Sequence, residues 1–361
     1  MRKSICFFIG PFGSGGGERN CCNLANAFVK QGIQVTVVAI GLKDHLFLKR
    51  FDSRVEFVDL GKKHLRHALI PMMKFLRAKQ PQHVLAFNHY MGTALELIRI
   101  MPGFNFTLHM RNIVGLTKKY QMNPSFWQSV ISKAFVKLLL KNLDGIVSQC
   151  HDMEADLVTN WSVSPIRSKV IFNPVAEEVE KNLKPWSLEG KEDEILFVGR
   201  LSKEKGIDFL IRSLKELLPR HPGLRVRLLG EGPIEKELKD LSASLGISDK
   251  VIFQGFVADP IPYYLKAKVT ALPSFSEGFP NVLIESITLG TPIVAFDCET
   301  GPSEIVREDF NGYLVELGHQ EKFTIALDRA LLKTWNFKIE DYRSGPIIRE
   351  YLDFLNFASH S

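Results

Sequence analysis

The sequence has no apolar run long enough to cross a membrane. Every apolar stretch falls short of the roughly 18 residues that a membrane-spanning helix needs. The basic residues Arg2 and Lys3 precede an apolar run at 5–9. Gly10 and Pro11 end that run before it reaches the length of a signal peptide's hydrophobic region. We therefore expect a cytoplasmic protein that meets any membrane from its surface.

Cysteine is scarce and poorly spaced for cross-linking or metal binding. The five cysteines are an odd number, two of them are adjacent, and no pair is spaced C-x-x-C. This pattern excludes a disulfide scaffold and a zinc ribbon, and it favours reduced thiols in the cytosol. The cysteines are Cys6, Cys21, Cys22, Cys150 and Cys298.

Low-complexity tracts and short repeats are also missing. Across 361 residues, 45% are hydrophobic and 24% are charged, which is ordinary for a globular protein. These values exclude a disordered tail protein and a collagen. The length favours two domains, each with its own hydrophobic core.

Acidic residues are scarce in only one half of the chain. Residues 1–175 carry 23 Lys and Arg against 10 Asp and Glu, a net charge of +13, whereas residues 176–361 carry 23 against 30, a net charge of −7. The basic half is suited to phosphates, a membrane surface or nucleic acid, unless it is simply an uneven solvated surface. Nucleic acid is the weakest of these partners because no basic stripe is interleaved with aromatic residues.

Short apolar runs alternate with helical patterns in two series. A Gly-rich loop at 10–17, a helix at about 18–31 and a strand at 34–40 follow the first strand, and this βαβ unit predicts a parallel sheet. A charged stretch at 173–194 separates the series and is the expected linker. The fold class is therefore α/β, and ligands are expected at the carboxyl ends of strands. Strands are expected at 5–9, 34–40, 84–87, 106–108, 145–148, 195–198, 225–229, 251–253, 269–272 and 292–295.

The strongest chemical signal is a pair of glutamates eight positions apart, Glu277 and Glu285, across a strand-to-helix turn. Pro280 suits the first helical turn, and the N–H groups of Asn281 and Val282 would point out of the helix start toward an anion such as a diphosphate. Glu285 would accept two hydrogen bonds from a diol such as a ribose, and Glu277 would bind a sugar hydroxyl. For an arbitrary pair at this spacing, one surface and one core-facing glutamate would be the plainer interpretation.

The segment 276–285 resembles the E-x7-E signature of the retaining glycosyltransferases of family four, which have the GT-B fold. The resemblance extends, in the family's order and spacing, over about 195–316. It implies two Rossmann-like domains that face each other across a cleft. An acceptor-binding domain at 1–172 would precede a nucleotide-sugar-binding domain at 195–336, and a helical segment at 337–361 would cross back to the first domain. The further motifs lie at 197–206, 230–233, 253–256, 272–274, 290–295, 301–305 and 311–315.

The resemblance assigns donor binding to the C-terminal domain. Arg200 and Lys205 bracket the turn after its first strand, where two fixed cations can neutralise a leaving diphosphate. Gly255 and Phe256 mark the position that the family uses for the base, and Gly230 begins a turn that lets the backbone approach it. The sequence lacks the D-x-D pair that holds a metal ion in the other main glycosyltransferase fold, so no cofactor is expected.

The N-terminal half matches the family less tightly. The loop Gly15, Gly16, Gly17, Glu18 and Arg19 resembles the family's G-G-x-E-R loop. Glycines at a helix start allow close approach of a phosphate or an acceptor sugar. The spacing does not fit G-x-G-x-x-G, which argues against a dehydrogenase.

A second N-terminal candidate group follows the strand expected at 106–108. Family members often carry a histidine here near the reacting sugar, a position that His109 matches. Arg111 and Asn112 keep part of an S-x-R-N run found in enzymes that add N-acetylhexosamines to lipid-linked oligosaccharides. The serine of that run is absent, which puts the subgroup in doubt.

Two basic features are candidates for a membrane surface. Lys62, Lys63, His64, Arg66 and His67 form a cluster suited to lipid headgroups or a lipid diphosphate. The helix expected at 126–142 carries a lysine stripe, but it is read more simply as a core-packed helix with a solvated edge. The cluster makes peripheral binding to an anionic membrane the favoured explanation of the charge asymmetry.

These residues and the resemblance predict a metal-independent retaining glycosyltransferase. It would move a hexose or N-acetylhexosamine from a nucleotide-sugar, in the first instance a UDP-sugar, to a lipid-linked, lipopolysaccharide or capsule glycan. Retention would follow front-face attack, with the leaving phosphate as base and Glu277, His109, Arg200 and Lys205 around the reacting centre. Two alternatives remain open: a nucleotide-sugar epimerase of the same fold, and a non-catalytic scaffold.

Overall fold

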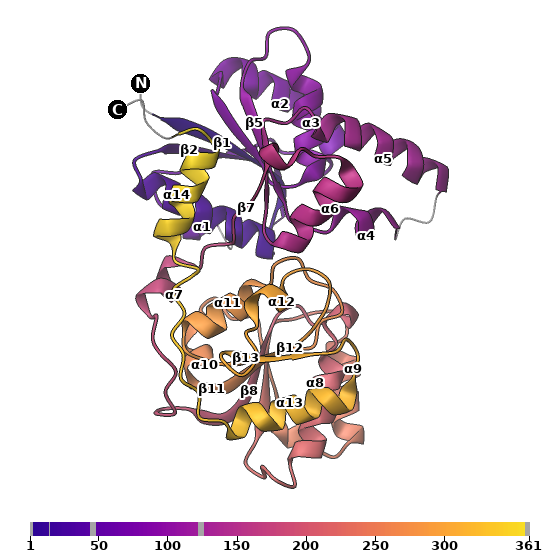
Figure 1. Cartoon of the computed structure of the whole chain (residues 1–361), viewed down its shortest axis with the longest axis vertical. Coiled ribbons are helices and arrows are strands. Elements are labelled where there is room, and N and C mark those ends of the chain that lie inside the picture. The colour runs from indigo at the N-terminus through magenta and orange to yellow at the C-terminus, as the bar shows by residue number, and fades with distance from the viewer. Residues whose placement is uncertain (1–2, 14, 44–47, 122–125, 358–361) are drawn as a thin grey trace. The chain divides into compact units, whose positions relative to one another are not determined.

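The computed structural model describes residues 3–13, 15–43, 48–121 and 126–357 (Figure 1). The chain divides into two compact units. Unit 1 comprises Met1–Pro174 and Arg343–Ser361, and unit 2 comprises Val175–Tyr342. Each unit has its own parallel sheet, and each is described by itself.

Unit 1 is built on a parallel sheet of seven strands, counted over its described residues, in the order β3-β2-β1-β4-β5-β6-β7. All of Ile5–Ile9 in the central strand is buried, as expected for a parallel sheet covered on both faces. The order reverses at β1, because β2 and β3 lie on one side of it and β4 to β7 on the other. The strands are β1 (Ser4–Phe12), β2 (Gln34–Leu42), β3 (Glu56–Asp59), β4 (His83–Ala86), β5 (Thr107–Asn112), β6 (Gly145–Ser148) and β7 (Ser168–Val170).

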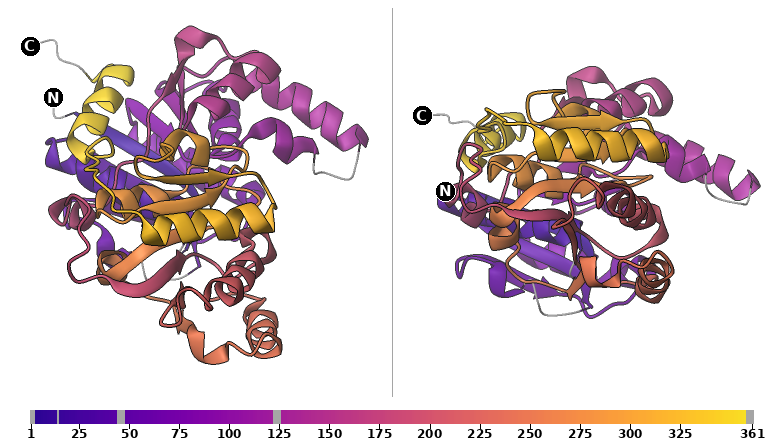
Figure 2. Two further views of the ribbon diagram at one scale, coloured as in Figure 1. Left: turned by 60° about the horizontal axis from the view of Figure 1, so that its bottom comes forward. Right: turned by 90° about the horizontal axis from the view of Figure 1, so that it is seen from below.

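Helices cover both faces of this sheet (Figures 1 and 2). On one face, α1 (Gly16–Lys30) packs beside α14 (Ser344–Phe354), where the ring of Phe28 meets that of Tyr351 at a centroid distance of 6.1 Å. The last described helix of the chain therefore completes the core of the N-terminal unit. The other helices of unit 1 are α2 (Leu65–Lys79), α3 (His89–Arg99), α4 (Leu116–Gln121), α5 (Phe126–Leu140) and α6 (His151–Trp161), with short 3-10 turns at Leu48–Arg50 and Pro165–Arg167.

Unit 2 contains a six-stranded parallel sheet in the order β10-β9-β8-β11-β12-β13. Its order reverses beside β8, so right-handed crossovers place α8 and α9 on one face and α10 and α11 on the other. The strands are β8 (Glu192–Val198), β9 (Arg225–Leu229), β10 (Val251–Gly255), β11 (Ala267–Leu272), β12 (Ile293–Phe296) and β13 (Gly312–Val315). The helices are α7 (Glu177–Lys181), α8 (Ile207–Leu217), α9 (Glu235–Ser244), α10 (Ile261–Lys266), α11 (Asn281–Thr288), α12 (Pro302–Ile305) and α13 (Gln320–Leu332), with 3-10 turns at Lys203–Lys205 and Ser248–Lys250.

The unit boundaries lie close to the expected domain boundaries but do not coincide with them. The chain leaves unit 1 after Pro174, and the expected linker at 173–194 contains α7 and the start of β8. It returns at Arg343 rather than at 337, and residues 358–361 of the returning segment lie outside the described part. None of the described helices has both the length and the hydropathy of a membrane span. All five cysteines are buried, and none of them forms a disulfide.

Candidate functional site

The carboxyl edge of the unit 2 sheet gathers most of the residues singled out by sequence. In an open α/β sheet, ligands bind where the strand order reverses, because the loops on either side diverge there. In unit 2 this point lies between β8 and β11, which are hydrogen-bonded neighbours. Arg200 and Lys205 follow β8, and Glu277 follows β11. The fold therefore brings together side chains that are more than seventy positions apart in sequence.

An ion pair joins these two loops. Lys205 Nζ lies 2.6 Å from Glu277 Oε1, and the side chains are only 20% and 11% exposed. Partial burial makes such a pair stronger than one on an open surface, because water screens it less. The pair fixes a cation and a carboxylate at the reversal point of the sheet.

The main chains of the two loops touch closely enough to require a glycine. Gly206 has φ +57, and a Cβ there would lie 2.1 Å from the carbonyl oxygen of Pro273. The N–H of Phe275 also donates to the carbonyl of Glu204 at 2.8 Å. The 3-10 turn that ends at Lys205 is therefore held directly against the loop that carries Glu277.

The second cation is placed differently. Arg200 is exposed, and no salt bridge to it is found in the described part of the chain. The pKa of Glu204 is lowered mainly by the hydrogen bond from Ser202 Oγ at 2.6 Å, and further by Lys205 and Arg200. Arg200 is thus a guanidinium open to solvent at the edge where an anion is expected.

Helix α11 begins at Asn281, as the sequence predicts. Pro280 is the N-cap residue rather than part of the first turn, and Asn281 and Val282 open the helix. The first backbone N–H groups of a helix have no acceptor inside the helix, so this end still favours an anion. Glu285 lies just over one turn into α11, as predicted, and it is only 1% exposed.

A tight backbone arrangement lies beside β9 and β10. The N–H of Gly230 donates to the carbonyl of Gly255 at 2.8 Å. Gly230 has φ +131, and a Cβ there would lie 1.9 Å from the carbonyl oxygen of Gly199. Phe256 is 46% exposed, and its N–H donates to Glu231 Oε1 at 3.4 Å. Glu231 was not among the site residues predicted from the sequence. Its position inside a Gly-Glu-Gly-Pro turn could have indicated that its side chain lies close to the main chain of a neighbouring loop.

In unit 1 the glycine loop follows β1, the strand at which the sheet order reverses. Gly15 is the N-cap of α1, and a Cβ at Gly16 or Gly17 would meet nothing within 4 Å. Among the described residues, neither packing nor a positive φ requires glycine at Gly16 and Gly17, although glycine weakens a helix.

A feature that sequence reasoning missed lies at the end of the adjacent strand, β4. Asn88 adopts φ +145, and its Oδ1 accepts from the N–H of Met91 at 2.9 Å, which caps α3. His89 follows it, is 1% exposed, and has a pKa that burial lowers to about 3. The usable signal was an Asn directly before a helix.

The structure corrects the position expected for His109. Strand β5 runs to Asn112, so His109 lies inside the strand rather than after it. The residue is 3% exposed, and its ring packs edge-on against Phe354 of α14 with centroids 5.7 Å apart. Burial lowers its pKa to about 4, which keeps the ring neutral at pH 7. His109 therefore belongs to the core of unit 1.

Arg111 is also a core residue. Its Nη2 donates to Asn173 Oδ1 at 2.5 Å, and its guanidinium lies over the rings of Phe87 and Tyr351 at 5.2 and 6.0 Å. Arg111 thereby connects β5 to α14 and to Asn173, which lies next to the end of the first chain segment of unit 1. Asn112 is fully buried at the carboxyl end of β5. Of His109, Arg111 and Asn112, only Asn112 therefore lies at the carboxyl edge of the sheet, where ligands are expected.

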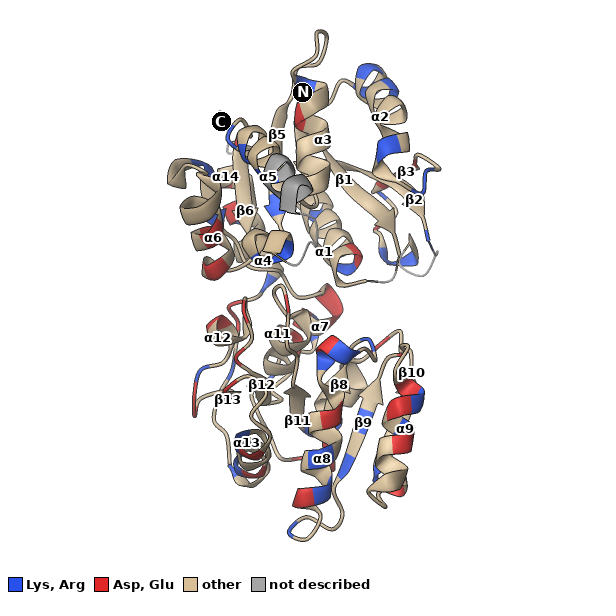
Figure 3. Ribbon diagram, turned by 90° about the vertical axis from the view of Figure 1, so that its right-hand side faces the viewer, with Lys and Arg blue, Asp and Glu red and all other residues tan. Residues whose placement is uncertain are grey.

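The basic cluster occupies the start of α2. Between β3 and β4 no residue from 60 to 82 is acidic, and α2 carries Lys and Arg but no Asp or Glu (Figure 3). The side chains of Lys63, His64, Arg66 and His67 are all exposed. Because α2 starts just after the carboxyl end of β3, the cluster lies at the same edge of the sheet as the glycine loop. One exposed apolar side chain, Ile70, stands among these cations at 67% exposure.

Comparison with known proteins agrees with this architecture. Residues 14–179 match the family described as Glycosyltransferase Family 4, and residues 178–341 match Glycosyl transferases group 1. An uncharacterized glycosyltransferase of Haemophilus influenzae is 30% identical over 331 residues, covering 90% of each chain. The N-acetylgalactosamine-N,N'-diacetylbacillosaminyl-diphospho-undecaprenol 4-alpha-N-acetylgalactosaminyltransferase of Campylobacter jejuni is 29% identical, covering 88% of this chain and 87% of its own.

Solved structures share the fold at low sequence identity. The lipopolysaccharide outer core galactosyltransferase WaaB superposes with a TM-score of 0.69 at 20% identity, covering 98% of both chains. HepE of Anabaena, in complex with UDP and glucose, gives 0.77 at 17% identity, covering 98% of this chain and 99% of its own. The two parallel β-sheets, each covered by helices, and the similarity to these solved structures show that the chain has the GT-B fold. The chain belongs to the family four glycosyltransferases, and it is therefore an enzyme of sugar transfer.

Proposed function

We propose that this enzyme is a retaining glycosyltransferase that takes a hexose or an N-acetylhexosamine from a UDP-sugar. The observation that carries the proposal is the meeting of Arg200, Lys205, Glu277 and the start of α11 at the reversal point of the unit 2 sheet. Cations and a helix start suit a diphosphate, and carboxylates suit the hydroxyls of sugars. The HepE structure of Anabaena contains UDP, and so does a structure of TarM of S. aureus, which has a TM-score of 0.77 at 12% identity; both support a uridine donor.

The proposed chemistry needs stabilisation of a leaving group above all. The bond between the anomeric carbon and the diphosphate oxygen breaks, and both electrons stay on that oxygen. Arg200, Lys205 and the first N–H groups of α11 stabilise the charge that develops there. The acceptor hydroxyl attacks from the same face and passes its proton to the leaving phosphate, so configuration is retained without an enzymic nucleophile.

The two glutamates take different parts in this scheme. Glu285 holds the ribose diol, and Glu277 orients the hydroxyls of the transferred sugar. Gly230, Gly255 and Phe256 form the base side of the site through their main chain. His109 receives no role, because its ring is buried under Phe354 in the core of unit 1.

The acceptor is assigned to unit 1. Gly16 and Gly17 leave the start of α1 open to a phosphate or sugar, and Asn112 lies at the same edge of the sheet. The basic start of α2 is suited to the diphosphate of a lipid-linked glycan or to an anionic membrane surface. The name of the Campylobacter relative includes a diphospho-undecaprenol acceptor, and a Rhizobium meliloti relative acts in lipopolysaccharide core biosynthesis. We therefore propose a lipid-linked or lipopolysaccharide-type acceptor met at the cytoplasmic face of the membrane.

The test is transfer from a panel of nucleotide-sugars by Arg200→Ala and Glu285→Ala. Loss of Arg200, which stabilises the leaving charge, should lower turnover by about a hundredfold or more, and loss of Glu285, which holds the ribose, should lower turnover at limiting donor. Lys203→Ala is the matched control, because Lys203 lies in the same loop with a side chain 79% exposed. Normal turnover of both site variants refutes the site. Isomerisation of a UDP-sugar without acceptor would instead indicate an epimerase, and full activity in EDTA is expected of a metal-independent enzyme.

A further inference from the structure

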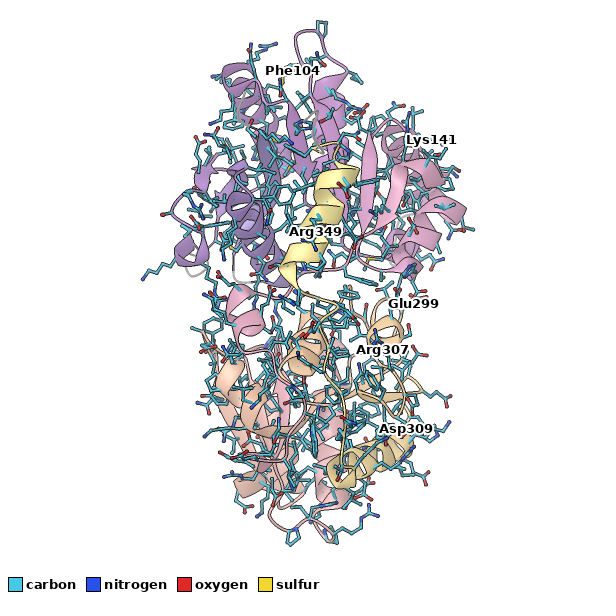
Figure 4. The ribbon with its side chains drawn as sticks, turned by 60° about the vertical axis from the view of Figure 1, so that its left-hand side comes forward. Phe104, Lys141, Glu299, Arg307, Asp309 and Arg349 are labelled. Carbon is cyan, nitrogen blue, oxygen red and sulfur yellow. The ribbon has the colours of Figure 1, made fainter. Side chains whose placement is uncertain are left out.

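The loop that follows β12 holds the loop that carries Glu277. Thr300 Oγ1 donates a hydrogen bond to the main-chain carbonyl of Glu277 at 2.7 Å, and Thr300 is only 8% exposed. A Cβ at Gly301 would lie 2.8 Å from the carbonyl oxygen of Gly278 and 2.7 Å from Cδ of Pro280. Two consecutive residues of one loop therefore fit directly against the turn between β11 and α11. Glu299, which precedes them, is labelled in Figure 4.

Thr300 keeps this position in an unfavourable backbone conformation. Its φ is +68, in the left-handed region that β-branched residues avoid. Such conformations persist where the surroundings enforce them, and they concentrate at functional sites. Glycine or asparagine would adopt this φ more easily, so the local backbone does not favour threonine. What threonine supplies and glycine lacks is the hydroxyl bound to Glu277.

Glu277 has two anchors in the described structure. Lys205 Nζ holds its carboxylate at 2.6 Å, and Thr300 holds its main-chain carbonyl. In the proposed function, the ammonium group of Lys205 also interacts with the leaving diphosphate, and this weakens its ion pair with Glu277. The Thr300 hydrogen bond does not involve the donor, so it remains when Lys205 is engaged.

We propose that Thr300 is a positioning residue of the donor site. Its hydroxyl fixes the main chain at Glu277, so that the carboxylate meets the sugar of the donor while Lys205 serves the diphosphate. This inference rests on the proposed function, in which Thr300 affects transfer only through Glu277. It predicts a defect in sugar transfer and not in nucleotide binding, which Arg200 and Glu285 carry.

The experiment compares Thr300→Val, Thr300→Gly and Thr300→Ser by kcat, by KM for the donor and by the Kd for UDP from calorimetry. We expect kcat to fall about tenfold in the valine and glycine variants, because misplacement of a reacting group lowers the rate more than it lowers binding. The Kd for UDP stays within about twofold, and the serine variant recovers most of kcat. Thr107→Val is the matched control, because Thr107 also donates to a carbonyl, that of Gln82, at the opposite edge of the unit 1 sheet.

The glycine variant separates positioning from stability. It relieves the strain at φ +68, which offsets part of the stability lost with the hydrogen bond, so it tests positioning even if the valine variant does not fold. Wild-type kcat in Thr300→Gly overturns the inference, and so does a loss of UDP affinity that parallels the loss of kcat. In a Glu277→Ala background, Thr300→Val should cause no further loss, whereas an additional tenfold loss refutes action through Glu277. If Glu277→Gln itself transfers sugar normally, the proposed function of Glu277 fails instead.

Discussion

The ion pair between Lys205 and Glu277 allows a quantitative prediction. Replacing Lys205 by Met leaves the Glu277 carboxylate without its partner in a position only 11% exposed. Exposed ion pairs contribute about 0–1 kcal/mol. Breaking a fully buried pair costs about 3–5 kcal/mol. With side chains 20% and 11% exposed, this pair lies between the two cases, so we expect Lys205→Met to lower the free energy of unfolding of unit 2 by about 2–3 kcal/mol.

The assay is urea unfolding of four proteins: the parent, Lys205→Met, Glu277→Gln and the double variant. Each single variant leaves one partly buried charge without its partner, whereas the double variant leaves no charge at either position. The double variant should therefore lose less stability than the two single losses combined, by about 1–2 kcal/mol. Additivity within about 0.5 kcal/mol would refute the reasoning, because it would mean that the two side chains do not interact in solution. Thermal melting should show the single variants about 5–10 °C below the parent.

Two further predictions concern unit 1. Burial lowers the pKa of His109 from 6.5 to about 4 and that of His89 to about 3, so the unfolded chain binds more protons below pH 6.5. The two neutral, buried rings therefore cost no stability above pH 6.5, and the protein loses stability as the pH falls from 6.5 to about 4. The urea midpoint should be lower at pH 5 than at pH 7. The difference between the two midpoints should be smaller in His109→Leu. Replacing Lys62, Lys63 and Arg66 by Gln should weaken binding to anionic vesicles about a hundredfold, at about 1 kcal/mol per charge. Sedimentation that is independent of anionic lipid or of salt contradicts the membrane assignment.

Much of the proposed donor site could be predicted from the sequence because the residues of each of its motifs lie close together along the chain. The E-x7-E spacing places Glu277 before a helix and Glu285 inside it, and both expectations agree with α11. The meeting of Lys205 with Glu277 follows from parallel topology, since both residues succeed neighbouring strands. The helix start at Asn281 also agrees, and only Pro280 differs, because it is the N-cap residue and not part of the first turn.

The residues that sequence reasoning misplaced depend on partners far along the chain. His109 and Arg111 were expected in a loop because polar residues follow the apolar run 106–108. In the structure, Phe354 and Tyr351 of α14, more than 230 positions later, cover them and let β5 continue to Asn112. Thr300 was missed for a similar reason, because its hydrogen bond depends on how the loops after β11 and β12 meet.

The acidic balance of the C-terminal half is compatible with an anionic donor because its acids are largely engaged elsewhere. Glu194 is paired with Arg227 at 2.7 Å within the sheet, and Asp309 with Lys333 at 2.8 Å near β13. Figure 3 shows that α9 carries both signs along its length. At the reversal point of the sheet, Lys205 is bound by one carboxylate and Arg200 is open to solvent, so an anion placed there would meet these local cations rather than the net charge of the unit. The basic balance of unit 1 is of another kind. Its cations at the start of α2 have no acidic neighbour in sequence from 60 to 82, which suits them to a charged partner from outside the chain.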